Sequence, residues 1–317
     1  MTRRPRTAQR LRVAVMGAGG IGSYYGGMLA RAGEDVTFIA RGAHLDALHN
    51  EGLTVLRELE RFTVQPVQAT QQPATVEPVD LVLLTTKTYD LDAALEAMQP
   101  LLGPQTLVLP LLNGVDIPER IAKRIPARQV FAGLTYVPAN RPRPGVVHQP
   151  GRERRLIFGE PDGPATERCA RVLAMLNGAG IRAEVSDEMP AETWRKFMLV
   201  AANGGVCGVT GSPIGMVMAD RDTRSLYRDC CREVQAVAAA CGVELERRAV
   251  DATMAHADST PMDMKPSMLQ DLEQGRPLEL EALNGTVVRL GRAHGVPVTV
   301  NTSIYAALKL RAPSREA

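Results

Sequence analysis

A short apolar strand that runs into a glycine-rich turn constrains this chain more than any other feature of its sequence. The strand Arg12–Met16 is followed by Gly17-x-Gly19-x-x-Gly22, and a helix is expected over Ile21–Ala32. In such a unit the first glycine forms the turn, the second lets the backbone approach a pyrophosphate, and the third lets the helix pack on the strand. We therefore predict a dinucleotide at the free N–H groups of the first helical turn, the alternative being a turn without a ligand. The residues concerned are Gly17, Ala18, Gly19, Gly20, Ile21 and Gly22.

The residue at the end of the second expected strand indicates which dinucleotide binds. This strand covers Asp35–Ala40, and Arg41 follows Gly22 by 19 residues. At about 20 residues past the glycines, a chain that binds NAD places an acidic residue against the ribose 2′-hydroxyl. A guanidinium at this place can instead bind a 2′-phosphate through two parallel hydrogen bonds. We therefore predict NADPH or NADP as the cofactor, the alternative being that Arg41 is a solvated surface residue.

Composition and charge exclude several other classes of function. The chain has 317 residues, 45% hydrophobic and 23% charged, which is enough for two domains with separate cores. Its formal net charge is +2, so no overall field favours nucleic acid or a membrane surface. No apolar run approaches the ~20 residues that span a bilayer. The five cysteines and five histidines lack metal-ligand spacing, so we expect no metal site. An odd number of irregularly spaced cysteines is typical of a protein in the reducing cytoplasm, so we expect that location.

Strand and helix signals alternate in the first part of the chain, and helical signals dominate after it. Apolar runs such as Val79–Thr85 and Thr106–Leu112 are typical of parallel strands buried on both faces. The Pro- and Arg-rich segment 138–151 is expected to form an exposed loop or hairpin. We predict an α/β fold in three parts: a disordered basic leader at 1–11, a Rossmann-like domain with a parallel sheet that binds NADP at 12–187, and an all-helical substrate domain at 188–317.

Two polar residues follow expected strands of the sheet. Lys87 comes after the strand ending at Thr85, and Asn113 comes after the strand ending at Leu112. Ligands bind at the carboxyl ends of parallel strands in folds of this class. We predict that both residues bind ligand, the alternatives being a solvated loop lysine and an ordinary Asn-Gly turn.

Three further candidates lie in the helical part of the chain. Lys196 is expected near the start of the first helix there. The helix dipole favours an acidic residue at that end, so a lysine in this position suggests a functional role. Asn203, seven residues on, shares its helix face. Glu279 is expected within a helix over Leu278–His294, and helical acids are most often solvated. By themselves, Lys196 and Glu279 could equally be surface residues.

Taken in order, these residues and several longer motifs match one known pattern. The motifs are Gly17-x-Gly19-x-x-Gly22, Arg41-Gly42, Lys87-Thr88, Asn113-Gly114, Trp194-x-Lys196, Ser267-Met268-Leu269-Gln270-Asp271, Glu279 ahead of Asn284-Gly285, and Arg292-Ala293-His294-Gly295-Val296-Pro297 followed by Asn301-Thr302. Over nearly the whole chain they resemble the ketopantoate reductase (2-dehydropantoate 2-reductase) family. The resemblance implies NADPH-dependent reduction of a 2-keto acid to a 2-hydroxy acid, with ketopantoate to pantoate in pantothenate and coenzyme A biosynthesis as the type reaction.

The resemblance also implies a role for each candidate residue. Lys196 would be the general acid that protonates the developing alkoxide, and Glu279 would orient the reactants. Ser267 would bind the substrate carboxylate, and Asn113 would contact cofactor and substrate. Arg41 and Lys87 would bind the phosphate end of the cofactor.

The sequence departs from the family pattern close to the expected acid. The family usually carries Asn one turn after the lysine and again further on, whereas this chain has Val200 and Ile214. Asn203 and Ser212 are nearby polar residues that could stand in for them. Apolar replacements lose discrimination for a hydroxylated substrate. Three readings stay open: ketopantoate, a more apolar keto acid, or a catalytically weak nucleotide-binding regulatory protein. If the protein is an enzyme, we expect a small-molecule substrate. The sequence leaves open whether the protein forms a homodimer.

Overall fold

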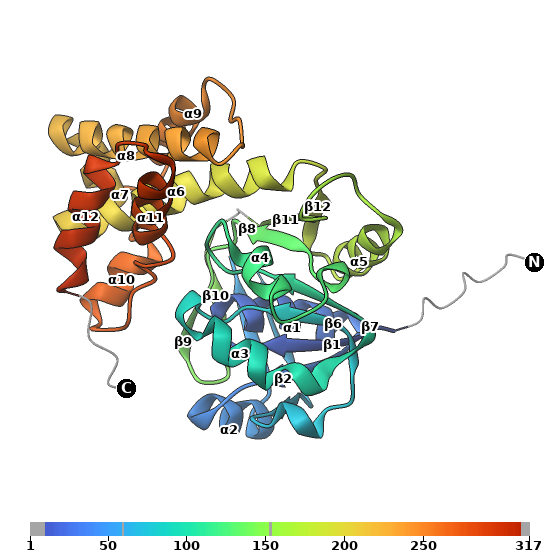
Figure 1. Cartoon of the computed structure of the whole chain (residues 1–317). Helices are drawn as coiled ribbons and strands as arrows, with labels where there is room; N and C mark the ends of the chain where they lie inside the picture. The colour runs from blue at the N-terminus through green and yellow to red at the C-terminus, as the bar shows by residue number, and fades with distance from the viewer. Residues whose placement is uncertain (1–9, 59, 152–153, 312–317) are drawn as a thin grey trace, which may run out of the picture. The chain divides into compact units, whose positions relative to one another are not determined.

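The computed structural model of the protein describes residues 10–58, 60–151 and 154–311 (Figure 1). The chain divides into two compact units, Met1–Leu112 with Ile117–Met189 and Asn113–Asp116 with Pro190–Ala317. The leader expected to be disordered lies, up to residue 9, outside the described residues. None of the helices in these ranges combines the length and the apolar composition of a membrane-spanning segment.

The first unit is built on a five-stranded sheet in which every neighbouring pair is parallel. Its strand order is β5 (Gln68–Thr70), β2 (Asp35–Ile39), β1 (Arg12–Met16), β6 (Val79–Leu84) and β7 (Leu102–Pro110). The chain runs outward from β1 to β2 and then returns to β6 on the other side of β1. The order therefore reverses beside β1, and such a switch point is where open α/β sheets bind ligands. The predicted parallel sheet is confirmed.

Helices cover both faces of this sheet. The α-helices in the described residues of the first unit are α1 (Gly20–Ala32), α2 (Gly42–Asn50), α3 (Leu91–Ala97), α4 (Ile117–Ala122) and α5 (Glu167–Gly178). One core contains Tyr24 and Leu29 of α1 packed on Val15 of β1. A second core, on the opposite face, contains Leu95 of α3 and Ile121 of α4. The two cores explain why the strands read as continuous apolar runs.

Two smaller sheets complete the first unit. One has the order β4 (Glu60–Val64), β3 (Leu53–Arg57), β10 (Val146–Gln149) and β9 (Asn140–Arg143), and the other has the order β12 (Arg182–Val185), β11 (Arg155–Gly159) and β8 (Ala132–Thr135). The segment 138–151 therefore forms a hairpin, β9–β10, and β10 pairs in parallel with β3. The strands β3, β4 and β5 were not expected from the sequence.

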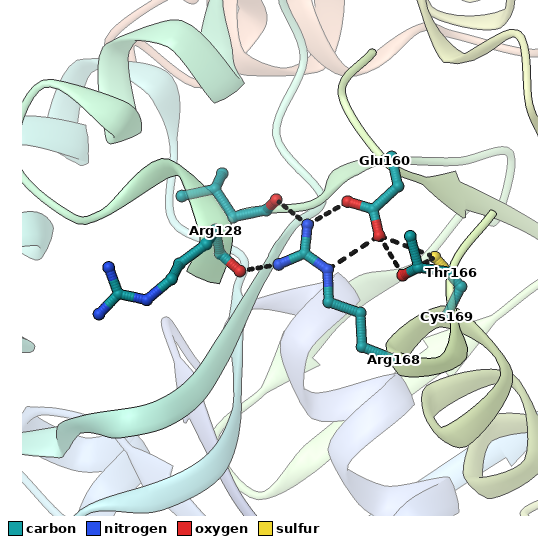
Figure 2. A network of polar contacts seen from close by, with 6 residues as sticks. Arg128, Glu160, Thr166, Arg168 and Cys169 are labelled. Atoms are coloured by element: carbon teal, nitrogen blue, oxygen red, sulfur yellow. Dashed lines mark hydrogen bonds and ion pairs between the residues drawn. The ribbon is translucent and has the colours of Figure 1, made fainter. Parts of the chain in front are cut away.

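An ion pair inside the first unit fastens α5 to the strands beside it (Figure 2). Arg168 Nε donates to Glu160 Oε1 at 2.8 Å, and a second guanidinium nitrogen contacts the other carboxylate oxygen. The same guanidinium donates to the backbone carbonyls of Arg128 and Val130, which lie just before β8. Hydrogen bonding by Arg168 holds the pKa of Glu160, a buried carboxyl group, below its usual range. This pair is therefore part of the frame that carries β8 and β11.

In the described residues of the second unit, all the regular elements are helices and no strand occurs, as predicted. Its helices are α6 (Met189–Thr210), α7 (Ile214–Ala219), α8 (Arg221–Ala240), α9 (Ala249–Asp258), α10 (Ser267–Glu273), α11 (Asn284–His294) and α12 (Thr299–Lys309). Two helix boundaries were wrong. The first helix begins at Met189, so Lys196 lies two turns inside it and the argument from the helix dipole does not apply. The helix expected from Leu278 begins at Asn284, and Glu279 lies in the turns before it, where Leu283 N bonds to Glu279 O.

Candidate functional site

The three motif glycines each have the local geometry that their expected role requires. Gly17 has φ +102°, a conformation that other residues rarely adopt. A Cβ on Gly19 would meet no atom within 4 Å, so this position is open to a ligand. A Cβ on Gly22 would overlap the Gly17 carbonyl oxygen and lie 2.8 Å from Val15 Cγ1. The loop thus leaves room for a pyrophosphate only at its second glycine, while the third packs α1 against β1.

The helix that follows the loop has an N-terminus suited to an anion. Its cap residue, Gly19, offers no side chain, and no acidic residue lies in the first turn. The first N–H groups of a helix have no partner within the helix, and they carry its positive dipole end. The loop is also held rigidly, because Ser23 Oγ donates to the Ala18 carbonyl at 3.0 Å. Residues 17–22 therefore fit the phosphates of a dinucleotide.

The structure places Arg41 and Lys87 on the same edge of the sheet as the glycine loop. Arg41 is exposed, lies two residues past the end of β2, and is the N-cap residue of α2, whose first turn contains no acid. Lys87 is half-buried, lies in an extended conformation just past β6, and is the N-cap residue of a short 3₁₀ turn. Because β2 and β6 flank β1 in parallel, their carboxyl ends meet beside the loop. Both cations therefore lie on the side where the cofactor phosphates are expected.

In the second unit, the structure brings together three of the predicted residues. Lys196 on α6 is only 8% exposed, and its Nζ donates to Asn113 Oδ1 at 3.0 Å. Asn113 belongs to the short segment 113–116 that packs with this unit. Glu279, 6% exposed, is close enough for its carboxylate to raise the pKa of Lys196. Residues far apart in the sequence thus form one buried polar cluster.

Burial sets the chemistry that this cluster can perform. Loss of solvent lowers the pKa of Lys196 to about 8, and the charge of Glu279 partly opposes that change. A lysine with this pKa is mostly protonated at neutral pH, yet it releases its proton more readily than an exposed lysine. The Asn113 amide fixes the direction of the ammonium group. The cluster can therefore hydrogen-bond an oxygen atom and protonate it when negative charge develops there.

The remaining substrate candidates have no hydrogen bond to Lys196 among the described residues. Asn203 is half-buried on α6, and its Oδ1 accepts a hydrogen bond from Tyr227 at 2.8 Å. Ser267 is the exposed first residue of α10, after Pro266. Tyr227 was missed by the sequence analysis, and nothing in its local sequence distinguishes it from other core residues of α8. It orients the Asn203 amide by holding the oxygen, which leaves the NH₂ group for another partner.

The apolar positions noted beside the lysine differ in exposure. Val200, one turn beyond Lys196, is half-buried and packs against the core of this unit. Ile214 is fully buried at the start of α7. Ser212 donates to the backbone carbonyl of Thr210, so its hydroxyl is already used in a local turn. Among the polar residues that could replace the expected asparagines, Asn203 is therefore the better placed.

Comparisons with known proteins agree over both units. Residues 13–163 match the family model described as ketopantoate reductase PanE/ApbA, and residues 188–312 match its C-terminal counterpart. The 2-dehydropantoate 2-reductase of Mesorhizobium japonicum is 32% identical, over 96% of this chain and 99% of that protein. A solved PanE/ApbA family ketopantoate reductase from Ralstonia eutropha superposes with a TM-score of 0.88 at 35% identity, over 95% of this chain and 98% of that one.

A solved relative with a different name is similarly close in structure. A D-mandelate dehydrogenase bound to NADH and anilino(oxo)acetate has a TM-score of 0.87 at 27% identity, over 95% of this chain and 98% of that one. Two family models that together span most of the sequence, and relatives above 30% identity along nearly its full length, agree with one another. The chain belongs to the ketopantoate reductase family.

Proposed function

We propose that the protein reduces a 2-keto acid to a 2-hydroxy acid with NADPH, and that its substrate is 2-dehydropantoate, which gives pantoate for pantothenate biosynthesis. Family membership makes the chain an NADP-dependent oxidoreductase that acts on CH–OH groups. The observation that carries the proposal is the buried cluster in which Lys196 Nζ bonds to Asn113 Oδ1 under the charge of Glu279. In this proposal residues 12–187 bind NADPH, residues 188–317 bind the keto acid, and the enzyme works in the cytoplasm.

The mechanism follows from the charge that develops during reduction. The dinucleotide, when bound, supplies the hydride. The ketone oxygen then gains negative charge, and the Lys196 ammonium group stabilises that charge and donates the proton. Asn113 and Glu279 hold the ammonium group in place, so little reorganisation is needed during the step. Ser267, at the exposed start of α10, is the proposed partner of the substrate carboxylate.

Consumption of NADPH, followed by the loss of nicotinamide absorbance, tests the proposal directly. Wild-type protein should oxidise NADPH in the presence of ketopantoate and should do so faster than with keto acids that lack its hydroxyl group. No turnover with any member of a panel of 2-keto acids would refute the proposed reaction.

A second candidate substrate is a more apolar 2-keto acid. It is supported by the half-buried Val200 next to Lys196 and by the similarity to a D-mandelate dehydrogenase. If this candidate is correct, phenylglyoxylate should have a higher kcat/KM than ketopantoate. Val200→Asn should then shift the ratio toward ketopantoate, since one new hydrogen bond contributes roughly 0.5–1.5 kcal/mol. We favour ketopantoate, because Asn203 shares the helix face of Lys196 and keeps its NH₂ group available; Val200→Asn should then be neutral or harmful.

A further inference from the structure

The β9–β10 hairpin of the first unit packs against the glycine loop. A Cβ on Gly20, the first residue of α1, would overlap the carbonyl oxygen of Ala139, which leads into β9. Two residues further on, Arg141 Nη1 donates to the Ala18 carbonyl oxygen at 3.4 Å. The hairpin therefore brings a guanidinium group to the loop at the N-terminal end of α1. The sequence analysis missed Arg141, because the hairpin folds back onto a loop more than a hundred residues earlier in the chain.

Arg141 and the next arginine on the same strand, Arg143, differ in their acidic partners among the described residues. In the part of the chain that the structure describes, no carboxylate pairs with Arg141, and its only hydrogen bond is the long one to Ala18. Arg143, two residues along, pairs with Glu51 at 3.5 Å. A guanidinium carries five N–H donors, so most of those on Arg141 remain for another acceptor. Arg141 lies on the exposed strand β9, and partial desolvation of its guanidinium group lowers its pKa.

A chain of hydrogen bonds fixes the hairpin to the loop through His44 of α2. Gly145, in the hairpin turn, donates its N–H to His44 Nδ1 at 3.0 Å, so the ring proton must be on Nε2. His44 Nε2 lies 3.4 Å from Ser23 Oγ, which in turn donates to the Ala18 carbonyl at 3.0 Å. Ser23 and His44 are both buried. The strand that carries Arg141 is therefore held at a fixed position relative to the loop.

The His44 ring is neutral at physiological pH, and it lies near the Arg141 guanidinium group. Burial, together with the nearby charge of Arg141, lowers the pKa of His44 to about 4. A neutral ring does not repel the guanidinium group and keeps Nδ1 as an acceptor for Gly145. The first turn of α1 adds no acid that could neutralise Arg141. The combined site, a helix N-terminus and an unpaired guanidinium, thus has a net positive charge that favours a phosphate group.

We propose that Arg141 binds the pyrophosphate of the dinucleotide and that His44 is a positioning residue that holds the Arg141 strand against the loop. The proposal rests on the proposed NADPH-dependent function. It assigns a different phosphate to each arginine: the 2′-phosphate to Arg41, at the end of β2, and the pyrophosphate to Arg141, above the loop. Because NADPH and NADH share the pyrophosphate and differ only in the 2′-phosphate, the two assignments give different results.

The test compares the affinities of the whole protein for NADPH and NADH, measured by nicotinamide fluorescence. Arg141→Gln should weaken both by the same factor, about tenfold, as expected for a lost charge-assisted hydrogen bond. Arg41→Gln should weaken NADPH alone. Arg143→Gln is the matched control, because Arg143 lies on the same strand and pairs with Glu51, and it should bind both nucleotides as the wild type does.

The possible results separate this proposal from the proposed function. If the wild type binds both nucleotides and Arg141→Gln binds them equally well, or loses affinity for NADPH alone, the pyrophosphate assignment is overturned. If the wild type binds neither nucleotide, the proposed function fails together with this assignment.

The positioning role of His44 has a readout of its own. His44→Phe should raise the KM for NADPH and leave kcat nearly unchanged. If His44 acts through Arg141, the double variant His44→Phe/Arg141→Gln should bind NADPH no more weakly than Arg141→Gln alone. Additive losses in the double variant would overturn the positioning role, and the thermal midpoint of each ligand-free variant verifies that it is folded.

Discussion

Burial of the Lys196 amine should set an alkaline limit on keto acid reduction. Loss of solvent lowers the pKa of Lys196 from 10.5 to about 8. A general acid must be protonated to act, so kcat/KM for the keto acid should be close to its maximum at about pH 7, half of that near pH 8, and lower by about tenfold for each further pH unit. A lysine with an ordinary pKa would keep activity nearly constant to about pH 10.

Removing the charge of Glu279 should move this limit in a defined direction. The carboxylate raises the pKa of Lys196, so Glu279→Gln should lower that pKa further and shift the alkaline limb to lower pH. One charge at close range is worth roughly one to two pKa units at the effective dielectric constant of a protein site. At about pH 7 the variant should therefore lose about two- to tenfold in kcat/KM through deprotonation alone.

The assay measures kcat/KM for the keto acid at saturating NADPH, from about pH 6 to about pH 10. Glu281→Gln is the matched control, since Glu281 is exposed and accepts a hydrogen bond from Tyr305 at 2.6 Å. It should reproduce the wild-type profile. A wild-type profile that stays flat to about pH 10 would refute the reasoning, as would a Glu279→Gln profile whose alkaline limb stays in place or moves to higher pH.

Three further predictions follow from other parts of the first unit. Arg41→Asp should remove most of the preference for NADPH over NADH, by about one to two decades, and equal use of both cofactors by the wild type would contradict it. Between about pH 4 and 6.5, His44 is protonated in the unfolded state but not in the folded state, so the free energy of unfolding should rise with pH by up to about 3 kcal/mol across that window. Urea unfolding of His44→Phe should not show this increase. Arg168→Met should destabilise the fold by about 3 kcal/mol by leaving Glu160 buried and unpaired, and a smaller loss in Arg168→Met/Glu160→Gln would support this cause.

The parts of the fold that depend on local pattern were predictable from the sequence. The glycine loop and the apolar runs of β1, β6 and β7 specify buried parallel strands, and the sheet is as expected. The strands β3 and β4 were missed because they are short and mostly half-buried, so they lack a continuous apolar run. The pairing of β3 with β10 joins residues about ninety positions apart in the chain. The pairing of strands so far apart in the chain depends on tertiary packing, which cannot be predicted from a local sequence pattern.

The site was predictable to a different extent. Lys196 and Glu279 were selected through the family pattern, whereas the local arguments about them failed, since α6 begins at Met189 and Glu279 precedes α11. Their clustering with Asn113 could not be read from spacing. Arg141 and His44 carried no signal, because their relation to the loop arises only when the hairpin folds back onto α1.

Turnover by Lys196→Ala, with NADPH and the best keto acid substrate, tests the central claim most directly. Arg195→Ala is the control, because Arg195 is the neighbouring cation on α6 and pairs with Glu192 and Glu246. If Lys196 is the general acid, its loss should lower kcat by about 10²–10⁴ while the affinity for NADPH stays close to that of the wild type. Turnover by Lys196→Ala close to that of the wild type and of Arg195→Ala would contradict the account.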